Sequence, residues 1–388
     1  MKPKLLIACI LTIVLLAIPS TLNAQQEKDS MQNTIVKAEK YLTQGKFTQA
    51  VSALDKIIQA DPENIDALNL LGRAYLSARK FQEAGIFFKR TLDVDADKAE
   101  ANLGLSITYL LDGKSQEAKP YALIASRSES TKIDALNILG QIAAQENDID
   151  NARKYYQEIL SIDSTHYDAL SNLGVLYQQA GNEAQGLEYF QRAVKFYPEN
   201  ASAYHNLGVL SSVLGRLHEA IINLNKAASL DSINPKSLRT LGIIYLKERL
   251  FSEAVFTFQR ALNRDYFNME SRVGKALGYW SLREYENVLR EIEDIRSLGI
   301  RFGRMELFLA NIYFEKKEYD KAMEYAKQDE QNNPSEAEGH YMLGMLHQIT
   351  GDKQLAEKEF NEASMITRQN PKARLLFSAD TYFTSGGK

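Results

Sequence analysis

The 388-residue chain has little cysteine and tryptophan, with one residue of each, and only five histidines and eight prolines. Its single cysteine, Cys9, lies close to the N-terminus. The rest of the chain therefore can form no disulfide bond and offers no thiol nucleophile. With 45% hydrophobic residues and no low-complexity tract, the composition is typical of a folded, soluble chain.

The chain also lacks a strong charge of either sign. It has 46 basic and 50 acidic residues, which gives a formal net charge of −4. Without residues 1–24, which contain two lysines and no acid, 44 basic and 50 acidic residues remain and the charge is −6. So weak an acidity argues against nucleic acid as a ligand and indicates no particular cationic partner.

Sequence patterns for catalysis or metal binding are missing as well. His340 and His347 lie seven residues apart, but they occupy positions where other parts of the chain have leucine and tyrosine, which favours packing over metal binding. The other histidines lack the HExxH spacing or a second ligand nearby. Gly113-Lys114-Ser115 resembles the end of a phosphate-binding loop, yet Thr108 stands where that loop requires glycine. The sequence predicts no enzymatic activity, no cofactor and no metal.

The N-terminus has the three parts of a secretory signal peptide. Two lysines precede an apolar run at 5–18, and Leu22-Asn23-Ala24 provides a small-residue cleavage site before Gln25. This predicts an exported, periplasmic protein with a short linker at 25–30. An uncleaved inner-membrane anchor is the alternative and would be the protein's only membrane contact, although 14 apolar residues fall short of the ~20 that span a bilayer. Leu6-Ile7-Ala8-Cys9 also resembles a lipobox, but the longer apolar run follows Cys9.

What fills the rest of the chain is a 34-residue period. Ten consecutive windows from Met31 to Asn370 align without an insertion. The eighth position of every window is small: Ala38, Gly72, Ser106, Gly140, Gly174, Gly208, Gly242, Ala276, Ala310 and Gly344. The twentieth position is small in all windows but the eighth, which has Val288: Ala50, Ala84, Ala118, Ala152, Gly186, Ala220, Ala254, Ala322 and Ala356. Two small positions per window predict two helices that cross closely.

Each window also has the pattern of two short amphipathic helices. Apolar residues recur at i, i+3 and i+4, as in Leu173, Leu176 and Tyr177. Ala180-Gly181-Asn182 is a typical turn between the two helices, because glycine tolerates the positive φ of a helix C-cap. Asp61-Pro62-Glu63-Asn64 ends a second helix, because proline lacks the N–H that would continue it. One helix pair cannot bury both of its faces, so the pairs are expected to stack on one another.

With tyrosine at position 11 in seven windows and an aromatic residue at position 24 in five, the windows resemble the tetratricopeptide repeat family over 340 of 388 residues. The resemblance implies an all-α fold of tandem helix-turn-helix repeats, stacked into a right-handed superhelical solenoid whose concave groove is lined mainly by the first helix of each pair. The implied repeats are 31–64, 65–98, 99–132, 133–166, 167–200, 201–234, 235–268, 269–302, 303–336 and 337–370. Residues 371–388 are expected to form a C-terminal capping segment and tail, with folding back over the groove as the alternative.

The resemblance also implies that positions 2, 5, 6, 9, 12 and 13 of the first helices line the groove. In windows four to six these positions carry side chains that can hydrogen-bond an extended peptide backbone, including Asn137, Gln141, Asn172, Gln179, His205 and Asn206. Window seven adds Arg239, part of a cationic belt suited to a carboxylate. Windows eight to ten are apolar at these positions, with Leu277, Trp280, Phe308, Phe314 and Tyr341.

Two interpretations of the apolar windows stay open, partner binding and packing. Window eight diverges most from the pattern, with Arg272 at position 4 and Lys275 at position 7, so its helix could be rotated and bury residues counted as exposed. The predicted function is a non-enzymatic scaffold of the bacterial cell envelope that binds other proteins or extended peptides, in a secretion, polysaccharide-export or envelope-assembly system. A glycan-binding or catalytic accessory protein that uses the apolar groove is the alternative.

Overall fold

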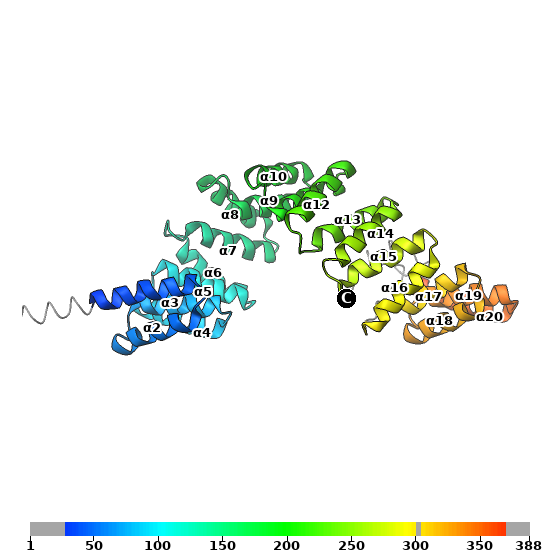
Figure 1. Ribbon diagram of the computed structural model, residues 1–388, viewed down its shortest axis with the longest axis horizontal. Coiled ribbons are helices and arrows are strands. Elements are labelled where there is room, and N and C mark those ends of the chain that lie inside the picture. The colour runs from blue at the N-terminus through cyan, green and yellow to red at the C-terminus, as the bar shows by residue number, and fades with distance from the viewer. Residues whose placement is uncertain (1–27, 300–303, 370–388) are drawn as a thin grey trace, which may run out of the picture. The chain divides into compact units, whose positions relative to one another are not determined.

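The computed structural model describes residues 28–299 and 304–369 (Figure 1). Within these ranges every regular element is a helix, and residues 28–30, which the sequence assigned to a linker, are already helical. The predicted signal peptide and the predicted C-terminal capping segment lie outside the described residues. In the described part, no helix combines the length and the apolar character that crossing a membrane requires.

The chain divides into two compact units, Met1–Ala193 and Val194–Lys388. The first unit begins with a helical segment at 28–43. It continues with α2 (Phe47–Ala60), α3 (Ile65–Ser77), α4 (Phe81–Val94), α5 (Ala99–Leu111), α6 (Ser115–Ala125), α7 (Lys132–Gln145), α8 (Ile149–Ile162) and α9 (Tyr167–Gln179). Helix α10 (Glu183–Phe196) carries the boundary between the two units.

The second unit continues the same alternation of helices. Its first members are α11 (Ala201–Val213), α12 (Leu217–Leu230), α13 (Lys236–Lys247), α14 (Phe251–Leu262) and α15 (Met269–Ser281). They are followed by α16 (Tyr285–Ser297), α17 (Met305–Glu315), α18 (Tyr319–Asn332), α19 (Ala337–Thr350) and α20 (Lys353–Gln369).

Within each unit, consecutive helices form pairs, and neighbouring pairs pack on one another (Figure 1). In the first unit α3 packs on α4, and α4 in turn packs on α5; in the second, α13 packs on α14 and α14 on α15. First helices of adjacent pairs also touch, as α3 touches α5 and α13 touches α15. The predicted all-α fold of tandem helix-turn-helix units is confirmed.

Small residues at positions 8 and 20 allow the two helices of a pair to approach closely. A Cβ atom added to Gly72 would lie 2.6 Å from the ring of Phe88, and one on Gly242 would lie 2.7 Å from the ring of Phe258. Both rings stand at position 24 and are fully buried. Because position 8 is where this ring meets the opposite backbone, a larger residue there would displace it.

The turn inside each pair has one backbone conformation throughout the described chain. Position 15 has a positive φ of 70–90° at its glycines, which include Gly45, Gly113 and Gly181. The same position has a φ of 58–62° where it is occupied by Arg79, Asn147, Arg249, Arg283 and Lys317. The amide after it bonds back to the first helix, as Leu250 N does to Tyr245 O at 2.8 Å. Packing of the pair therefore sets this left-handed residue, whichever side chain it carries.

Window eight keeps its register despite its unusual sequence. Ala276 at position 8 and Val288 at position 20 are both fully buried. Lys275 is buried and donates to Glu291 (2.5 Å) and to Gln259 (2.6 Å). The charged residues are thus accommodated by pairing, and the helix rotation considered from the sequence is not needed to explain them.

Candidate interaction surfaces

Positions 5 and 6 of the first helices lie at the seam between neighbouring windows. His205 Nδ1, at position 5, lies 3.0 Å from Oγ of Ser237 on the next first helix. Gly104, at position 6, lies so close to Phe88 of the preceding pair that an added Cβ would be 2.3 Å from a ring carbon. Several side chains at these two positions therefore take part in stacking.

Four of the predicted amide residues belong to the first unit. Gln179 is exposed at the end of α9, whereas Asn137, Gln141 and Asn172 are half-buried. Oδ1 of Asn137 is enclosed and has no hydrogen-bond partner among the described residues. Gln141 and Gln179 are consequently the amides best placed to meet an incoming chain, and Asn137 belongs to the seam.

The second unit holds the other polar candidates. Asn206 and Arg239 are half-buried, and Arg239 NH1 lies 3.7 Å from a carboxylate oxygen of Glu270. His205 is buried, which corrects the prediction that it lines the groove. Burial, helped by the positive charges of Lys236 and Arg239, lowers the pKa of His205 to about 4, so the imidazole is neutral near pH 7.

The apolar candidates of windows eight to ten are largely core residues. Leu277 and Phe308 are each only 1% exposed, so the prediction that they form part of a binding surface is wrong. Trp280 is half-buried and its ring meets Phe308 edge-on at 5.7 Å. Phe314 is half-buried as well and contacts the ring of Tyr319 at 5.9 Å. Leu277 and Phe308 share one core cluster with residues of neighbouring helices, which is why their exposure was overestimated from the sequence.

Tyr341, the last apolar candidate, lies on α19 beside the ring of Phe360, with the ring centroids 5.5 Å apart. Both rings are half-buried and line a pocket of about 420 Å³ on α19 and α20. Tyr341 is therefore a predicted apolar residue that the structure places in a pocket.

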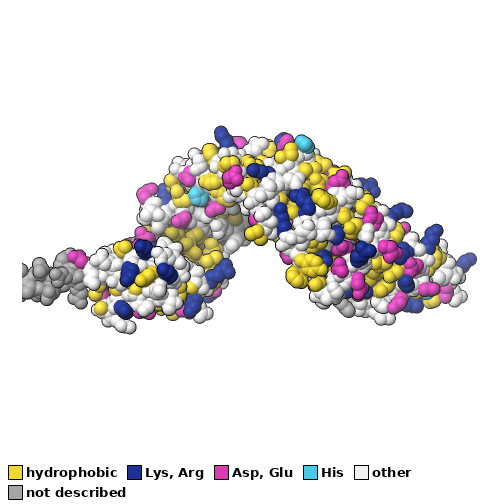
Figure 2. All heavy atoms as spheres, viewed as in Figure 1, with side chains coloured by type: hydrophobic (Ala, Val, Ile, Leu, Met, Phe, Trp, Pro, Cys, Tyr) yellow, Lys and Arg dark blue, Asp and Glu magenta, His cyan; other side chains and the backbone are white. Residues whose placement is uncertain are grey.

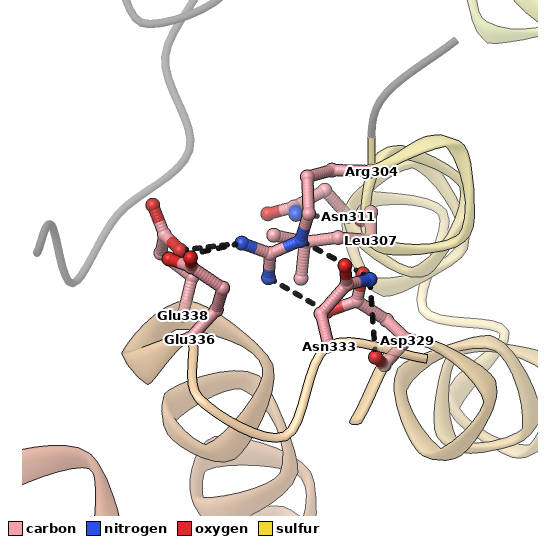
Figure 3. A network of polar contacts seen from close by, with 7 residues as sticks. All are labelled: Arg304, Leu307, Asn311, Asp329, Asn333, Glu336 and Glu338. Carbon is pink, nitrogen blue, oxygen red and sulfur yellow. Dashed lines mark hydrogen bonds and ion pairs between the residues drawn. The ribbon is translucent and has the colours of Figure 1, made fainter. Parts of the chain in front are cut away.

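Between the ninth and tenth windows a buried ionic network fixes the stacking (Figure 3). Arg304 precedes α17 and bonds both carboxylate oxygens of Asp329 on α18, at 2.9 and 2.7 Å. It also bonds Glu338 on α19 at 2.7 Å. Asp329 is fully buried and accepts a further bond from Asn333 (3.1 Å). Because the guanidinium of Arg304 is already bonded to carboxylates on α18 and α19, this network holds three helices together and is not a ligand site.

An exposed apolar edge was not anticipated from the sequence. Ile233, in the loop between α12 and α13, is 83% exposed, while Tyr266 and Phe267, between α14 and α15, are 57% and 68% exposed. Arg264 links the two loops, because its guanidinium donates to three backbone carbonyls within residues 228–234 at 2.7–3.0 Å. Figure 2 shows hydrophobic side chains projecting from this margin of the second unit, near the start of α15.

These loops are ordered by their own hydrogen bonds. The backbone N–H of Ile233 bonds Asp231, that of Phe267 bonds Asp265, and Arg272 packs its guanidinium 4.1 Å from the Tyr266 ring centroid. The two apolar loops can be recognised in the sequence at positions 32 and 33 of the repeat, where Ile233, Tyr266 and Phe267 stand. The other described loops have no large aliphatic or aromatic residue at these positions: Pro62-Glu63, Ala96-Asp97, Ser130-Thr131, Ser164-Thr165, Pro198-Glu199 and Pro334-Ser335. Comparing loops in register would have found the apolar edge.

The described residues contain no group of three or more side chains suited to hold a metal ion. His340, considered above with His347, instead pairs its Nδ1 with Glu359 at 2.7 Å. The buried His205–Ser237 pair lies near the positive charges of Lys236 and Arg239, which is the reverse of the carboxylate environment that activates a serine.

Comparison with protein families gives one consistent result. Family models described as tetratricopeptide repeat match residues 41–103 and 143–208, residues 103–167, and residues 201–234, 307–328 and 337–370. Together they cover more than half of the chain. The chain belongs to the tetratricopeptide repeat family. Proteins of this family are generally non-enzymatic scaffolds that bind other proteins or peptides. A comparison with curated protein sequences gives no match.

A solved structure shows the same fold. A tetratricopeptide repeat protein from Parabacteroides merdae is 18% identical, with a TM-score of 0.51 over 64% of this chain and 99% of that one. PilF of Pseudomonas aeruginosa is 19% identical, with a TM-score of 0.47 over 55% and 96% of the two chains. The Cut9–Hcn1 assembly of the APC/C is 17% identical with a TM-score of 0.48, and the match spans 63% of this chain but only 55% of that chain.

Proposed function

We propose that this tetratricopeptide repeat protein is a non-enzymatic interaction scaffold of the bacterial cell envelope. The observation that carries the proposal is the surface of the first helices, where several pairs in each unit present partly exposed polar side chains. Gln141 and Gln179 in the first unit, and Asn206 and Arg239 in the second, are the members of this set with accessible groups.

Amide side chains suit a partner that is held in an extended conformation. Each glutamine amide supplies two N–H donors and a carbonyl acceptor, which match the unpaired N–H and C=O groups of a peptide backbone without demanding a particular sequence. Gln141 and Gln179 lie on α7 and α9, first helices that touch each other in the first unit, so one bound chain could contact both amides. Arg239 adds a cation that could pair with a carboxylate of the partner.

The apolar edge of Ile233, Tyr266 and Phe267 provides a second contact for a protein partner. Three large apolar side chains held out by ordered loops lose little conformational entropy on binding, and aromatic anchors of this kind dominate many interfaces. Helix α13 follows one of the two loops and carries Arg239 in its first turns, so one partner could contact the edge and this helix of the second unit together.

Export to the periplasm is part of the proposal and rests on the N-terminal sequence. Cleavage after Ala24 would give a protein that begins at Gln25. Mass spectrometry of the purified envelope protein should then find Gln25 as the N-terminal residue and no peptide from residues 5–18. Recovery of the intact N-terminus from membranes would establish the anchored form instead. A secretion, polysaccharide-export or envelope-assembly complex is the proposed setting.

The glycan-binding or catalytic alternative has less support than the scaffold. It required an exposed aromatic shelf in windows eight to ten, whereas Leu277 and Phe308 are buried and Trp280 packs against Phe308. We therefore do not propose it.

Site-specific photocrosslinking in cells tests the scaffold proposal. A benzophenone amino acid placed at Gln179 or at Phe267 should form covalent adducts with a partner protein, which mass spectrometry of the adduct identifies. Matched controls are Phe256 on α14, 66% exposed against 68% for Phe267, and Ile86 on α4 in the first unit. Adducts at the control positions alone, or at none of the four, would contradict the proposed surfaces.

A further inference from the structure

A buried cation lies beneath the apolar edge of the second unit. Arg272 is only 2% exposed, and its Nε donates to the backbone carbonyl of Tyr266 at 3.0 Å. Its guanidinium lies 4.1 Å from the centroid of the Tyr266 ring. Nη2 of Arg272 is enclosed and has no hydrogen-bond partner among the described residues. The side chain is thus aimed at the exposed loop and carries an unused donor.

The repeat does not need an arginine at this place. Position 4 is leucine in four other windows, and all four side chains are buried: Leu68, Leu136, Leu170 and Leu238. A buried guanidinium costs free energy unless a negative charge pairs with it. Leucine would avoid that cost, so packing alone does not account for Arg272.

Other cations held inside the second unit have a carboxylate partner. Lys275 lies 2.5 Å from Glu291, and Arg304 lies 2.7 Å from Asp329. The contacts of Arg272 described above are instead a carbonyl oxygen and an aromatic ring, neither of which carries a full negative charge. Its charge is therefore not compensated by these contacts.

The acidic residues of the two loops are already engaged. Asp231 and Asp265 each accept a backbone N–H of their own loop, at 3.3 and 3.1 Å, and so order it. Glu270, at the start of α15, lies 3.7 Å from Arg239 on α13. These carboxylates hold the loops and helices in place, and Nη2 of Arg272 stays unpaired beside them.

Tyr266 covers the guanidinium with a ring that is easily moved. The side chain is 57% exposed, and its ring meets Phe267 edge-on at 5.5 Å. A cation–π contact near the surface contributes little, and exposed side chains change rotamer rapidly. Rotation of this one ring would give a partner access to Arg272, with Phe267 and Ile233 on the same edge.

We propose that this edge binds a protein segment in which a carboxylate stands next to a bulky apolar side chain, and that Arg272 pairs with the carboxylate. Guanidinium and carboxylate groups form strong bidentate pairs, so the partner supplies the negative charge that is missing. Tyr266 swings aside, and the apolar side chain of the partner packs on Phe267 and Ile233. The inference rests on the proposed function, because it names the chemistry of the partner at one of its surfaces.

Peptide selection on the immobilised full-length protein tests the inference. Displayed random heptapeptides should yield sequences with Asp or Glu beside an aromatic or aliphatic residue, and Phe267→Ser should abolish their enrichment. The best peptide is then compared with its isosteric Asn or Gln form. The acidic form should bind the wild-type protein more tightly by about tenfold or more. On Arg272→Gln the two forms should bind within about twofold, since glutamine keeps an N–H for the Tyr266 carbonyl but removes the charge.

Arg239→Gln is the matched control, because it removes one positive charge from α13 in the same unit, and it should keep the preference for the acidic peptide. Arg272→Leu should fold and lose the preference. Equal binding of the two peptides to the wild-type protein, or an unchanged preference in Arg272→Gln, would overturn the inference and leave the edge as a purely apolar contact of the proposed function. If no enriched peptide depends on Phe267, the edge fails as a partner surface and the inference fails with it.

An anionic membrane fits this edge less well, because its loops also carry Asp231 and Asp265. Vesicles of phosphatidylglycerol and phosphatidylcholine should therefore not sediment with the protein. Co-sedimentation that Phe267→Ser abolishes would overturn the inference in favour of a lipid surface.

Modification of arginine by phenylglyoxal measures the movement of Tyr266. Arg272 should react slowly in the wild-type protein and faster by about tenfold or more in Tyr266→Ala, because the reaction requires an accessible guanidinium. Phe267→Ala, which truncates the neighbouring exposed ring, is the control and should change the rate little. Mass spectrometry of proteolytic peptides gives both rates. Equal rates in the two variants, or no protection of Arg272 by the acidic peptide in Tyr266→Ala, would overturn the inference.

Discussion

At the scale of single residues, the buried ion pair of window eight is the clearest departure from the repeat pattern. Position 7 is leucine in eight windows, and Lys275 replaces it in the eighth. Its ammonium group is neutralised by Glu291, whose second carboxylate oxygen is enclosed and has no hydrogen-bond partner among the described residues. The ion pair offsets the cost of burying the lysine ammonium group. Removing either partner would leave the charge of the other buried without compensation.

Removing one member of this pair should therefore be worse than removing both. Lys275→Met alone should lower the free energy of unfolding by about 3–5 kcal/mol, because it leaves Glu291 buried without a cation. The double variant Lys275→Met/Glu291→Leu should recover most of that loss. Denaturant unfolding followed by circular dichroism measures both. Equal destabilisation by the single and the double variant would show that packing volume, and not charge, dominates this site.

His205 should make stability depend on pH. Its folded pKa of about 4 lies below the ordinary value of 6.5, so the unfolded chain binds the proton more tightly. The stability that neutral His205 contributes is complete above pH 6.5 and is lost as the pH falls toward 4, by roughly 2–3 kcal/mol.

The variant His205→Asn should remove this part of the pH dependence. Asparagine occupies the same position in Asn69 and Asn137, so the fold accepts it there. Denaturant unfolding of both proteins between pH 7 and pH 4 gives the difference, which cancels the titration of carboxylates common to both. Parallel stability curves for the two proteins would contradict the assignment.

At the scale of elements, the sequence predicted the helix pairs and their glycine turns but not how uniform the turns are. Gly113 and Gly181 indicate a left-handed backbone conformation in the sequence, because glycine adopts this conformation without strain. Arg249 and Lys317 adopt it as well, with φ of 62° and 61°, and no local rule predicts that for a long side chain. Packing of the two helices of the pair imposes the conformation at these positions. This is a tertiary effect, so it cannot be predicted from the type of residue.

Replacing such a residue with glycine should relieve strain. Arg249→Gly is expected to raise the free energy of unfolding by about 0.5–1 kcal/mol, because the left-handed conformation is unfavourable for residues that carry a Cβ. The neighbouring Glu248 has a φ of −81°, so Glu248→Gly serves as the control and should lower stability. Thermal unfolding of the two variants decides between them, and the opposite order would contradict the strain argument.

The candidate binding residues were predicted less well than the helices, for a reason that also lies at the element scale. A helical pattern tells which face of a first helix is apolar, but exposure at position 6 depends on position 24 of the preceding pair. Phe308, at position 6, is buried in a core cluster with Ile292, which stands at position 24 of the preceding pair. Asn206, at position 6 of its own window, is half-buried. Only pairwise comparison of windows separates such cases, and the exposed Tyr266 and Phe267 needed the same comparison of loops.

At the scale of the whole molecule, the described contacts are local in sequence. Within each unit, helices in extensive contact lie one or two steps apart along the chain, as α3 does from α4 and from α5. Each pair is therefore stabilised by its own packing and by its immediate neighbours, and no single core couples distant pairs. A strain introduced at one pair should weaken the adjacent interfaces and fade beyond them.

Native-state hydrogen exchange of the Lys275→Met variant tests this locality. The substitution lies on α15, so amides of α13 to α18 should exchange faster than in the wild-type protein, whereas α3 to α6 in the other unit should keep their protection. The control is Lys247→Met, at an exposed position of α13, which should change neither region. A uniform increase of exchange from α3 to α20 would mean that the chain unfolds as one cooperative body. Loss of protection confined to the second unit is what a chain of neighbour-coupled helix pairs requires, because the interfaces between α13 and α18 are the ones that the uncompensated Glu291 destabilises.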